Sequence, residues 1–363
     1  MKRRKRIAVL TGGGDCPGLN AVIRAVAKKA MLDHDMEVIG VEDGYLGLIE
    51  NRCRPLSYQD VSGILTLGGT ILGTSNTANP YRHAVREGGK LSLKDVSKTA
   101  IRNLKKLGVL CLVCIGGDGT LAIAHRLQQD GVNVVGVPKT IDNDLRGTDV
   151  TFGFDSAVSV ATEGIDRIHT TAQSHHRVMI VEVMGRTAGW LALHAGVAGG
   201  GDVILIPEMP YHVEAIAERV TQRAKTGKRF SIIVVSEGAK PKGGDVTIRR
   251  VVKESTIAVR LGGIGFVLGE QIENMTGLIT RVVVMGHLQR GGSPTPFDRV
   301  LATRLGAKAM DLIHEGDFGH MVGVRGSRLV KVPLTKVAQG PRNVSKNEPL
   351  IAVARSVGTS FGD

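Results

Sequence analysis

The feature of this sequence that most constrains its fold is a regular alternation of short apolar runs with helical patterns. Strand-like runs are predicted at residues 6–11, 37–41, 110–115 and 132–137, and again at 177–183, 203–206 and 231–236. Helical patterns lie between them, at residues 20–32, 95–107, 120–129, 188–198 and 213–225. Strands that alternate with helices form largely parallel sheets covered by helices on both faces. We therefore predict an α/β fold in which ligands bind beyond the carboxyl ends of the strands.

Composition and charge exclude several classes of protein. The chain is 42% hydrophobic and 22% charged, which is typical of a globular protein and not of a disordered or fibrous one. Its longest unbroken apolar run, 109–115, is too short to span a membrane, and the run 7–10 is too short for a signal peptide. The formal net charge of +13 favours an anionic partner: a phosphorylated small molecule, an acidic lipid or nucleic acid.

The four cysteines do not have the pattern of a disulfide framework. Cys111 and Cys114 have CxxC spacing, but they lie in an apolar strand-like run, where residues three apart point to opposite faces. We therefore expect both in the core and not in a redox or metal site. The absence of a disulfide framework favours a reducing compartment, most simply the cytoplasm.

Three loops that follow predicted strands are candidates for chemistry: 12–18 (GGGDCPG), 116–120 (GGDGT) and 138–144 (PKTIDND). Glycines at the start of a helix let backbone N–H groups approach a phosphate, and Asp118 could hold Mg²⁺ beside it. Asp142 and Asp144 would point to one side of an extended segment, as a base and a carboxylate near the metal. Neither GxGxxG nor GxxxxGK[ST] occurs at these loops, so a generic dinucleotide or Walker site is excluded. A tight turn, a helix cap and an Asx turn remain alternatives for the three loops.

Basic residues are clustered at several predicted strand ends. The clusters are His175-His176-Arg177, the Arg186 segment, Arg281, and the segment 287–290 that ends at Arg290. A single arginine is usually a solvated surface charge, but several at strand ends form a set suited to clamp phosphate groups. No histidine and cysteine set has the spacing of a zinc site.

Taken together in chain order, these residues resemble one family, the 6-phosphofructokinases. The motifs that carry the resemblance are TGGGDCPGLNAVIR (11–24), DGYLGL (43–48), GGTILGTS (68–75), GGDGT (116–120), PKTIDND (138–144), VEVMGR (181–186), SEG (236–238) and GHLQRGG (286–292). The resemblance covers about residues 5–310 and implies transfer of the γ-phosphate of ATP to O1 of fructose 6-phosphate, with Mg²⁺, in glycolysis. The products would be fructose 1,6-bisphosphate and ADP.

The resemblance also implies an architecture of two Rossmann-like lobes with the active site in the cleft between them. The nucleotide-binding lobe would comprise residues 1–153 with a return segment at about 289–339. The sugar-phosphate lobe would comprise residues 154–288 with about 340–363. The family forms homo-oligomers, so we expect a homodimer or homotetramer whose sites are completed by the neighbouring subunit, and neither nucleic acid nor a membrane as partner.

Residue roles follow from the resemblance position by position. The nucleotide-binding positions correspond to Gly14, Tyr45, Gly117, Asp118, Gly119 and Thr120, and Asp118 corresponds to the metal-linked carboxylate. Asp142 corresponds to the general base, with Thr140 and Arg186 as further catalytic positions. The sugar-phosphate positions are Thr140, Ile141, Asp142, Met184, Gly185, Arg186, Glu237, His287, Leu288, Gln289 and Arg290, and Arg177 and Arg281 match positions supplied by the neighbouring subunit. This set agrees with the chemistry of phosphoryl transfer, which needs cations, positioning and one weak base.

Two departures from the usual bacterial ATP enzymes concern the phosphate donor. Asn76 stands where the family's loop carries a phosphate-bridging arginine, and Lys139 stands where those enzymes usually have glycine. Lysine at 139 is typical of pyrophosphate-using relatives, whereas glycine at 119 is typical of ATP users. An aspartate at 119 would fill the space of the α-phosphate, while Lys139 suits either donor. We therefore favour ATP, and a pyrophosphate-dependent phosphotransferase is the alternative.

Two other classes share single features with this chain. The NAD and lipid kinases share the GGDGT loop, but they lack the motifs at 138–144 and 287–292. A nucleic-acid-binding protein would account for the +13 charge, but the chain lacks an RNP-like aromatic pattern, zinc spacing and a basic recognition helix.

Overall fold

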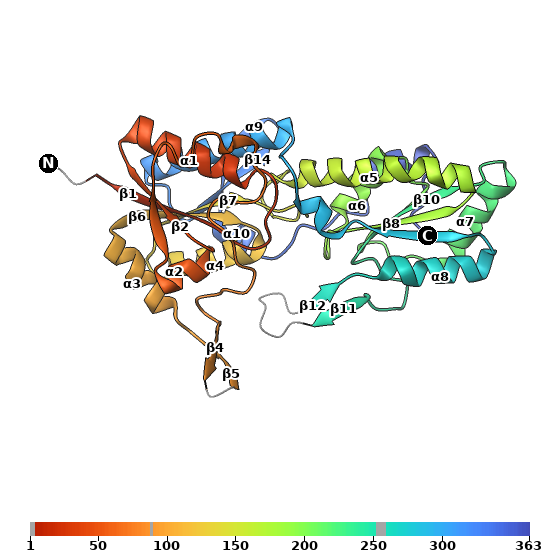
Figure 1. Cartoon of the computed structure of the whole chain (residues 1–363), viewed down its shortest axis with the longest axis horizontal. Coiled ribbons are helices and arrows are strands. Elements are labelled where there is room, and N and C mark those ends of the chain that lie inside the picture. The colour runs from red at the N-terminus through yellow and green to blue at the C-terminus, as the bar shows by residue number, and fades with distance from the viewer. Residues whose placement is uncertain (1–3, 88–89, 252–258) are drawn as a thin grey trace.

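The computed structural model describes residues 4–87, 90–251 and 259–363 and arranges most of them around two sheets (Figure 1). Within these residues the first sheet has seven strands and the second has four. We call the part of the molecule built on the first sheet the first lobe, and the part built on the second sheet the second lobe. The α/β fold predicted from the sequence is confirmed.

The first sheet has a parallel centre with one antiparallel strand at each edge. Its strands in spatial order are β15 (Arg328–Pro333), β14 (His320–Arg325), β7 (Val134–Pro138), β6 (Val109–Gly116), β1 (Arg6–Thr11), β2 (Glu37–Val41) and β3 (Cys53–Leu56). Parallel strands covered on both faces have continuous apolar sequences, which explains the run in β6. Cys111 and Cys114 lie buried in β6 in core clusters on opposite faces of the sheet, as predicted.

The second sheet is entirely parallel. Its strands in spatial order are β13 (Thr280–Val284), β8 (Val178–Val183), β10 (Ser231–Ser236) and β9 (Val203–Leu205). Two antiparallel hairpins project on the same side of the molecule (Figure 1). They are β4 (His83–Glu87) with β5 (Lys90–Lys94), and β11 (Ile248–Val251) with β12 (Val259–Leu261).

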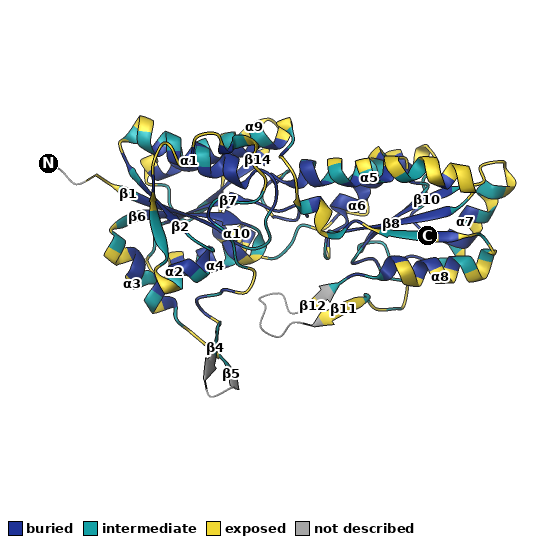
Figure 2. Cartoon of the chain, viewed as in Figure 1, coloured by how far each residue is buried: buried dark blue, intermediate teal, exposed yellow. Residues whose placement is uncertain are grey.

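Helices cover both faces of each sheet. In the first lobe α1 (Leu19–His34) and α9 (Pro296–Glu315) lie on one face, and α2 (Tyr45–Glu50), α3 (Ser97–Leu107), α4 (Asp118–Gln129) and α10 (Leu334–Val337) lie on the other. In the second lobe α5 (Phe154–His175) and α6 (Trp190–Ala198) lie opposite α7 (Val213–Lys225) and α8 (Ile264–Thr276), and α11 (Pro349–Ser356) packs on α6. The 3₁₀ helices are η1 (Ile64–Thr66) and η2 (Gly286–Arg290). Figure 2 shows buried residues along the strands and exposed residues on the outer sides of the helices.

One hydrophobic cluster joins the two lobes. It contains Val9 of β1 and Val181 of β8, together with buried residues of α1, α5, α6 and α9. The chain passes from the first lobe to the second through α5 and returns through α9, which packs on α1. The facing ends of the two sheets are therefore held against each other by shared apolar packing.

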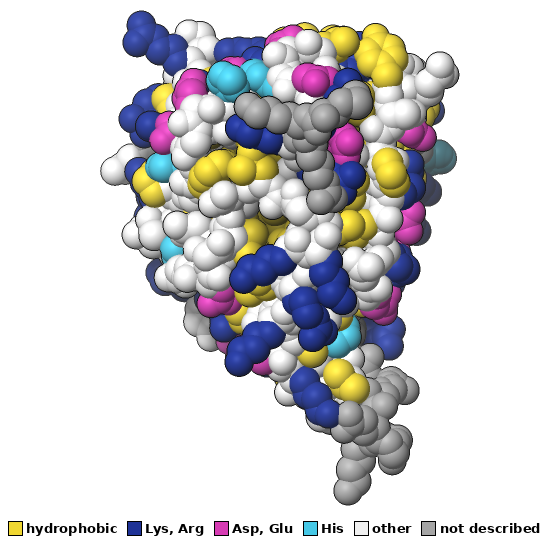
Figure 3. All heavy atoms as spheres, turned by 90° about the vertical axis from the view of Figure 1, so that its left-hand side faces the viewer, with side chains coloured by type: hydrophobic (Ala, Val, Ile, Leu, Met, Phe, Trp, Pro, Cys, Tyr) yellow, Lys and Arg dark blue, Asp and Glu magenta, His cyan; other side chains and the backbone are white. Residues whose placement is uncertain are grey.

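Positive charge collects on the outer end of the first lobe. Figure 3 shows this face, on which Lys and Arg side chains gather above the β4–β5 hairpin. Helix α3 contributes exposed Lys98, Arg102, Lys105 and Lys106 to the lobe's surface. Part of the net charge thus lies away from the second lobe. Among the residues that the structure describes, no helix is both long and apolar enough to cross a membrane.

Candidate active site

The loops at the carboxyl ends of the two sheets meet between the lobes. The first lobe brings the loops after β1, β6 and β7, and the second lobe brings those after β8, β10 and β13. Two contacts cross the boundary: Arg186 Nη1 lies 3.5 Å from Asp118 Oδ1, and Arg290 Nη1 donates to the carbonyl oxygen of Asp15 at 2.9 Å. This is where ligands bind in open parallel sheets, so we describe it as the candidate active site.

The first glycine loop, after β1, is held from both sides. The buried ammonium of Lys139 donates to the carbonyl oxygen of Gly14. On the other side, the N–H of Gly13 donates to Ser75 O at 3.2 Å, and Thr74 Oγ1 donates to Gly13 O at 2.6 Å. Burial lowers the pKa of Lys139. The amino group of Lys139 therefore lies against the backbone of the first glycine loop.

The second glycine loop opens α4, whose first residue is Asp118. Gly119 follows it on the exposed side, and a Cβ placed there would meet no described atom within 4 Å other than those of its own neighbours and helix backbone. Tyr45 lies beneath this loop, only 3% exposed, and its hydroxyl donates to Thr120 O at 2.8 Å. Tyr45 therefore supports the loop from the core. The free N–H groups at the start of α4 favour an anion at this point.

The third loop, after β7, is not extended, so that part of the sequence prediction is wrong. Asn143 adopts a left-handed backbone conformation with φ of 52°, which asparagine tolerates better than most residues. Its Oδ1 accepts from the N–H of Thr151 at 3.1 Å, and Thr151 Oγ1 donates to Thr140 O at 2.7 Å. The N–H of Asp142 donates to Thr140 Oγ1 at 3.0 Å. These bonds hold the backbone bend between Asp142 and Asp144.

Two buried carboxylates lie on this bend. Asp142 is 4% exposed, and its Oδ1 has no hydrogen-bond partner among the described residues. Burial raises the pKa of Asp144 to about 7, and the negative charges of Asp142 and Asp118 act in the same direction. The Arg186 guanidinium opposes this shift. This buried oxygen has no protein donor and is therefore able to accept a proton or a hydrogen bond.

The second lobe contributes a turn after β8 and a carboxylate after β10. Met184 and Gly185 lead into Arg186, whose backbone is left-handed with φ of 52° and whose N–H donates to Glu237 Oε1 at 3.1 Å. A Cβ placed on Gly238 would overlap the carbonyl oxygen of Arg186, so this close approach requires glycine. Burial raises the pKa of Glu237 to about 7.

Some predicted site residues have other surroundings. The side chain of Ile141 is fully buried in the core, so only its backbone can face a ligand. Gln289 is fully buried in η2 and donates to Gly286 O at 3.1 Å, whereas its neighbours His287 and Leu288 are exposed.

Arg177 and Arg281 lie at the opposite end of the second sheet. Arg177 directly precedes β8, and Arg281 is the second residue of β13. Arg281 pairs in register with Met179. A strand of six residues spans about 20 Å, so these arginines are far from the loops at the carboxyl ends of the same chain.

Arg342, which was not predicted as a site residue, contacts the third loop. Its Nη2 donates to Asn143 O at 3.0 Å. The segment around it follows α10 and has no helix or strand of its own. No local motif marks it, because the contact joins residues 199 positions apart.

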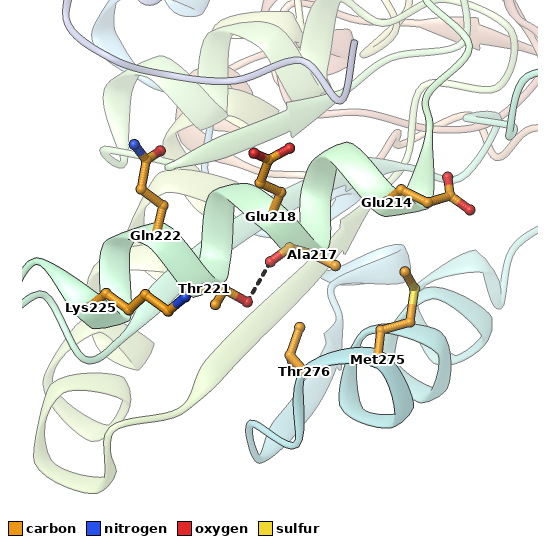
Figure 4. Close-up of a pocket in the computed structure, with 8 residues that line it drawn as sticks. All are labelled: Glu214, Ala217, Glu218, Thr221, Gln222, Lys225, Met275 and Thr276. Carbon is orange, nitrogen blue, oxygen red and sulfur yellow. Dashed lines mark hydrogen bonds between the residues drawn. The ribbon is translucent and has the colours of Figure 1, made fainter.

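A groove of about 460 Å³ lies elsewhere, between α7 and α8 (Figure 4). Glu214, Glu218 and Lys225 line it from α7, and Met275 lines it from α8. None of its lining residues belongs to the strand-end loops, so it is separate from the candidate active site.

Comparison with known proteins identifies the family. The family model described as Phosphofructokinase matches residues 6–313. The chain belongs to the phosphofructokinase family. "ATP-dependent 6-phosphofructokinase 2" of Clostridium perfringens is 52% identical, with all of both chains covered. "ATP-dependent 6-phosphofructokinase" of Chloroflexus aurantiacus is also 52% identical, over 99% of each chain.

Relatives with another donor in their names are equally similar. "Pyrophosphate--fructose 6-phosphate 1-phosphotransferase" of Amycolatopsis methanolica is 53% identical, over 91% of this chain and 94% of its own. Among solved phosphofructokinases, that of Pichia pastoris in the T-state has a TM-score of 0.78 and 30% identity. It covers 99% of this chain, which spans 37% of the yeast chain. Overall identity therefore establishes the family, and the donor depends on particular residues.

Proposed function

We propose that this phosphofructokinase transfers the γ-phosphate of ATP to O1 of D-fructose 6-phosphate, giving fructose 1,6-bisphosphate and ADP. One observation carries the proposal: buried Asp142 keeps an unpartnered carboxylate oxygen where the glycine loops meet, beside Arg186. Full-length relatives named as ATP-dependent enzymes support it.

The chain's own residues supply a base and cations. Asp142 accepts the proton of the attacking hydroxyl while the new O–P bond forms and the bond to the leaving ADP oxygen breaks. The guanidinium of Arg186 stabilises the negative charge on the transferred group, and Thr140 donates to it. Backbone N–H groups of residues 117–120 hold the nucleotide phosphates. The missing side chain of Gly14 leaves room for the Arg290 guanidinium. Glu237 and Arg290 bind the sugar phosphate, as expected from their motifs.

Asp118 is the residue that would hold Mg²⁺. In the described ranges no three His, Cys, Asp or Glu side chains form a group able to hold a metal ion. The single partly buried carboxylate of Asp118 at the start of α4 fits Mg²⁺, which usually binds through one or two carboxylates, several waters and the substrate phosphates. Mg²⁺ held there would supply positive charge that neutralises the charge developing on the phosphate groups.

The second candidate function is phosphoryl transfer from pyrophosphate. Lys139 favours it, because this buried ammonium lies behind the first glycine loop and could bind a donor without a nucleoside. The deciding experiment measures kcat/KM of the purified protein with fructose 6-phosphate and Mg²⁺ for ATP, other nucleoside triphosphates and pyrophosphate. We expect ATP to be preferred. Pyrophosphate as the better donor would replace this proposal with the alternative.

We also propose a homo-oligomer in which Arg177 and Arg281 complete the sugar-phosphate site of a neighbouring subunit. The supporting observation is their location at the amino end of the second sheet, remote from the strand-end loops. Mixing two inactive variants, Asp142→Asn and Arg281→Ala, tests it. Hybrid dimers would contain one intact shared site and regain activity, whereas sites formed within one chain would stay inactive.

The boundaries of the two lobes stay predictions. We propose that residues 1–153 with about 289–339 bind the nucleotide, and that residues 154–288 with about 340–363 bind the sugar phosphate. The cytoplasmic location also stays a prediction.

A further inference from the structure

A segment close to the C-terminus lies against the third loop of the active site. We call residues 340–344 the C-terminal strap. Arg342 Nη2 donates to two carbonyl oxygens, those of Asn143 and Asp149, each at 3.0 Å. The backbone N–H of Arg342 donates to Asp144 O at 2.6 Å. Arg342 therefore bonds the carbonyl groups of Asn143 and Asp144, the two residues that follow Asp142.

The same strap is bonded to the second lobe. Trp190 Nε1 donates to the carbonyl oxygen of Arg342 at 2.8 Å, and the Arg342 guanidinium carbon lies 4.5 Å from the centre of the Trp190 ring. The N–H of Val344 donates to Glu208 Oε1 at 2.8 Å, and the same carboxylate accepts from the N–H of Gly189 at 3.0 Å. Gly189 and Trp190 directly follow the turn that carries Arg186.

The strap thus contacts both loops on which catalysis depends, one from each lobe. We infer that Arg342 is a positioning residue that holds the Asp142 loop in its productive place relative to the Arg186 turn. The inference rests on the proposed function of Asp142 and Arg186. It goes beyond the family resemblance, because the motifs that carry the resemblance end at residue 292.

Arginine suits this task because its guanidinium has several donors in a fixed plane, so one side chain can bond two carbonyl oxygens while its face packs on a ring. Asn143, which carries one of these carbonyl groups, has a left-handed backbone conformation that needs support from its surroundings. Without the guanidinium the carbonyl oxygens of Asn143 and Asp149 lose this donor. The bend then keeps the bonds of Thr151 and of the Arg342 N–H but is held less tightly, so Asp142 can shift. A displacement of about 1 Å in a reacting group can lower the rate about 100-fold.

The test compares Arg342→Ala and Arg342→Lys with wild type, after wild-type activity has been established. The backbone bond to Asp144 survives in both variants, so they remove only the guanidinium contacts. We expect Arg342→Ala to lower kcat by about 10- to 100-fold with KM values within about threefold. Arg342→Lys should recover part of the loss, because one ammonium can still bond one carbonyl. Arg355→Ala is the matched control: this arginine also packs on a ring, but it lies on α11 and pairs with Asp363.

A double-mutant cycle separates positioning from general stability. In the Asp142→Asn background the base is already lost, so Arg342→Ala should lower kcat less than about threefold further. A loss as large as in wild type would overturn the inference, as would wild-type kcat in Arg342→Ala. If Arg342→Ala does not fold, Trp190→Phe and Arg342→Lys replace it, each expected to lower kcat about 3- to 10-fold. An inactive wild type would overturn the proposed function and this inference with it.

Discussion

Placing a carboxylate at Gly119 tests the donor assignment without disturbing the fold. Gly119 is the second residue of α4, exposed, and a side chain there meets open space. Aspartate is a somewhat better helix residue than glycine, and negative charge in the first turn of a helix is stabilising. We therefore expect Gly119→Asp to leave the free energy of unfolding unchanged or to raise it by up to about 1 kcal/mol. Any loss of activity then reports on the ligand.

The expected loss follows from the charge of the nucleotide. Two unit charges about 4 Å apart repel each other by about 4 kcal/mol at an effective dielectric constant of about 20. Because Gly119 is exposed, solvent screens part of this repulsion, and we reduce it by about half. The remaining ~2 kcal/mol corresponds to about a 30-fold loss in kcat/KM for ATP. Pyrophosphate lacks the nucleoside-linked phosphate and should lose less.

The assay measures kcat/KM with ATP and with pyrophosphate for wild type, Gly119→Asp and Gly119→Asn, together with thermal unfolding. Asparagine has nearly the size of aspartate without its charge, so it separates repulsion from the filling of space. An ATP kcat/KM in Gly119→Asp within about twofold of wild type, in a folded protein, would refute the reasoning. A wild type that prefers pyrophosphate would make Lys139 the deciding residue.

Three further variants test other parts of the site and its support. Asp142→Asn should lower kcat by about 10²- to 10⁴-fold and leave the KM for fructose 6-phosphate within a few-fold; kcat near wild type would show that Asp142 is not the base. Gly238→Ala should lower the unfolding midpoint and raise that KM, because the new methyl overlaps the carbonyl oxygen of Arg186, whereas Gly119→Ala should not lower the midpoint. Burial raises the pKa of Asp298 from 3.8 to about 6, so the folded state binds this proton more tightly than the unfolded state. The stability that this proton contributes is complete below about pH 4 and is lost as the pH rises through about 6. We therefore measure by urea unfolding how much the free energy of unfolding falls between pH 4 and pH 8. This fall should be about 3 kcal/mol smaller in Asp298→Asn than in wild type. An equal fall in both proteins would contradict the raised pKa of Asp298.

The elements that could be predicted are those whose sequence pattern is strong and local. β1 and β10 have the predicted bounds because each is a continuous apolar run, and α7 does because its apolar face repeats regularly between polar residues. Helix α5 was not predicted. Its buried positions include several alanines, which contrast weakly with their neighbours, and Gly164 is a poor helix former in its middle.

For the site, the order of the motifs was sufficient to predict which loops converge, because the carboxyl ends of parallel strands lie at the same end of the sheet. The bend at Asn143 was not predicted, since its left-handed backbone depends on the bond from Thr151 eight residues away. Arg342 was not predicted because its contacts to the third loop are purely tertiary. The location of Tyr45 beneath its loop likewise depends on packing that no motif records.

The pairing of β14 with β7 has a consequence for how the protein is made. On the ribosome β7 emerges early, but the strand that covers its edge emerges only after all of β8 to β13. At ordinary rates of synthesis of 5–20 residues per second, this leaves an apolar edge strand uncovered for about 10–40 s. An open edge of this kind can pair with another nascent chain. The yield of folded protein should therefore depend on translation speed and on chaperones that cover exposed strand edges.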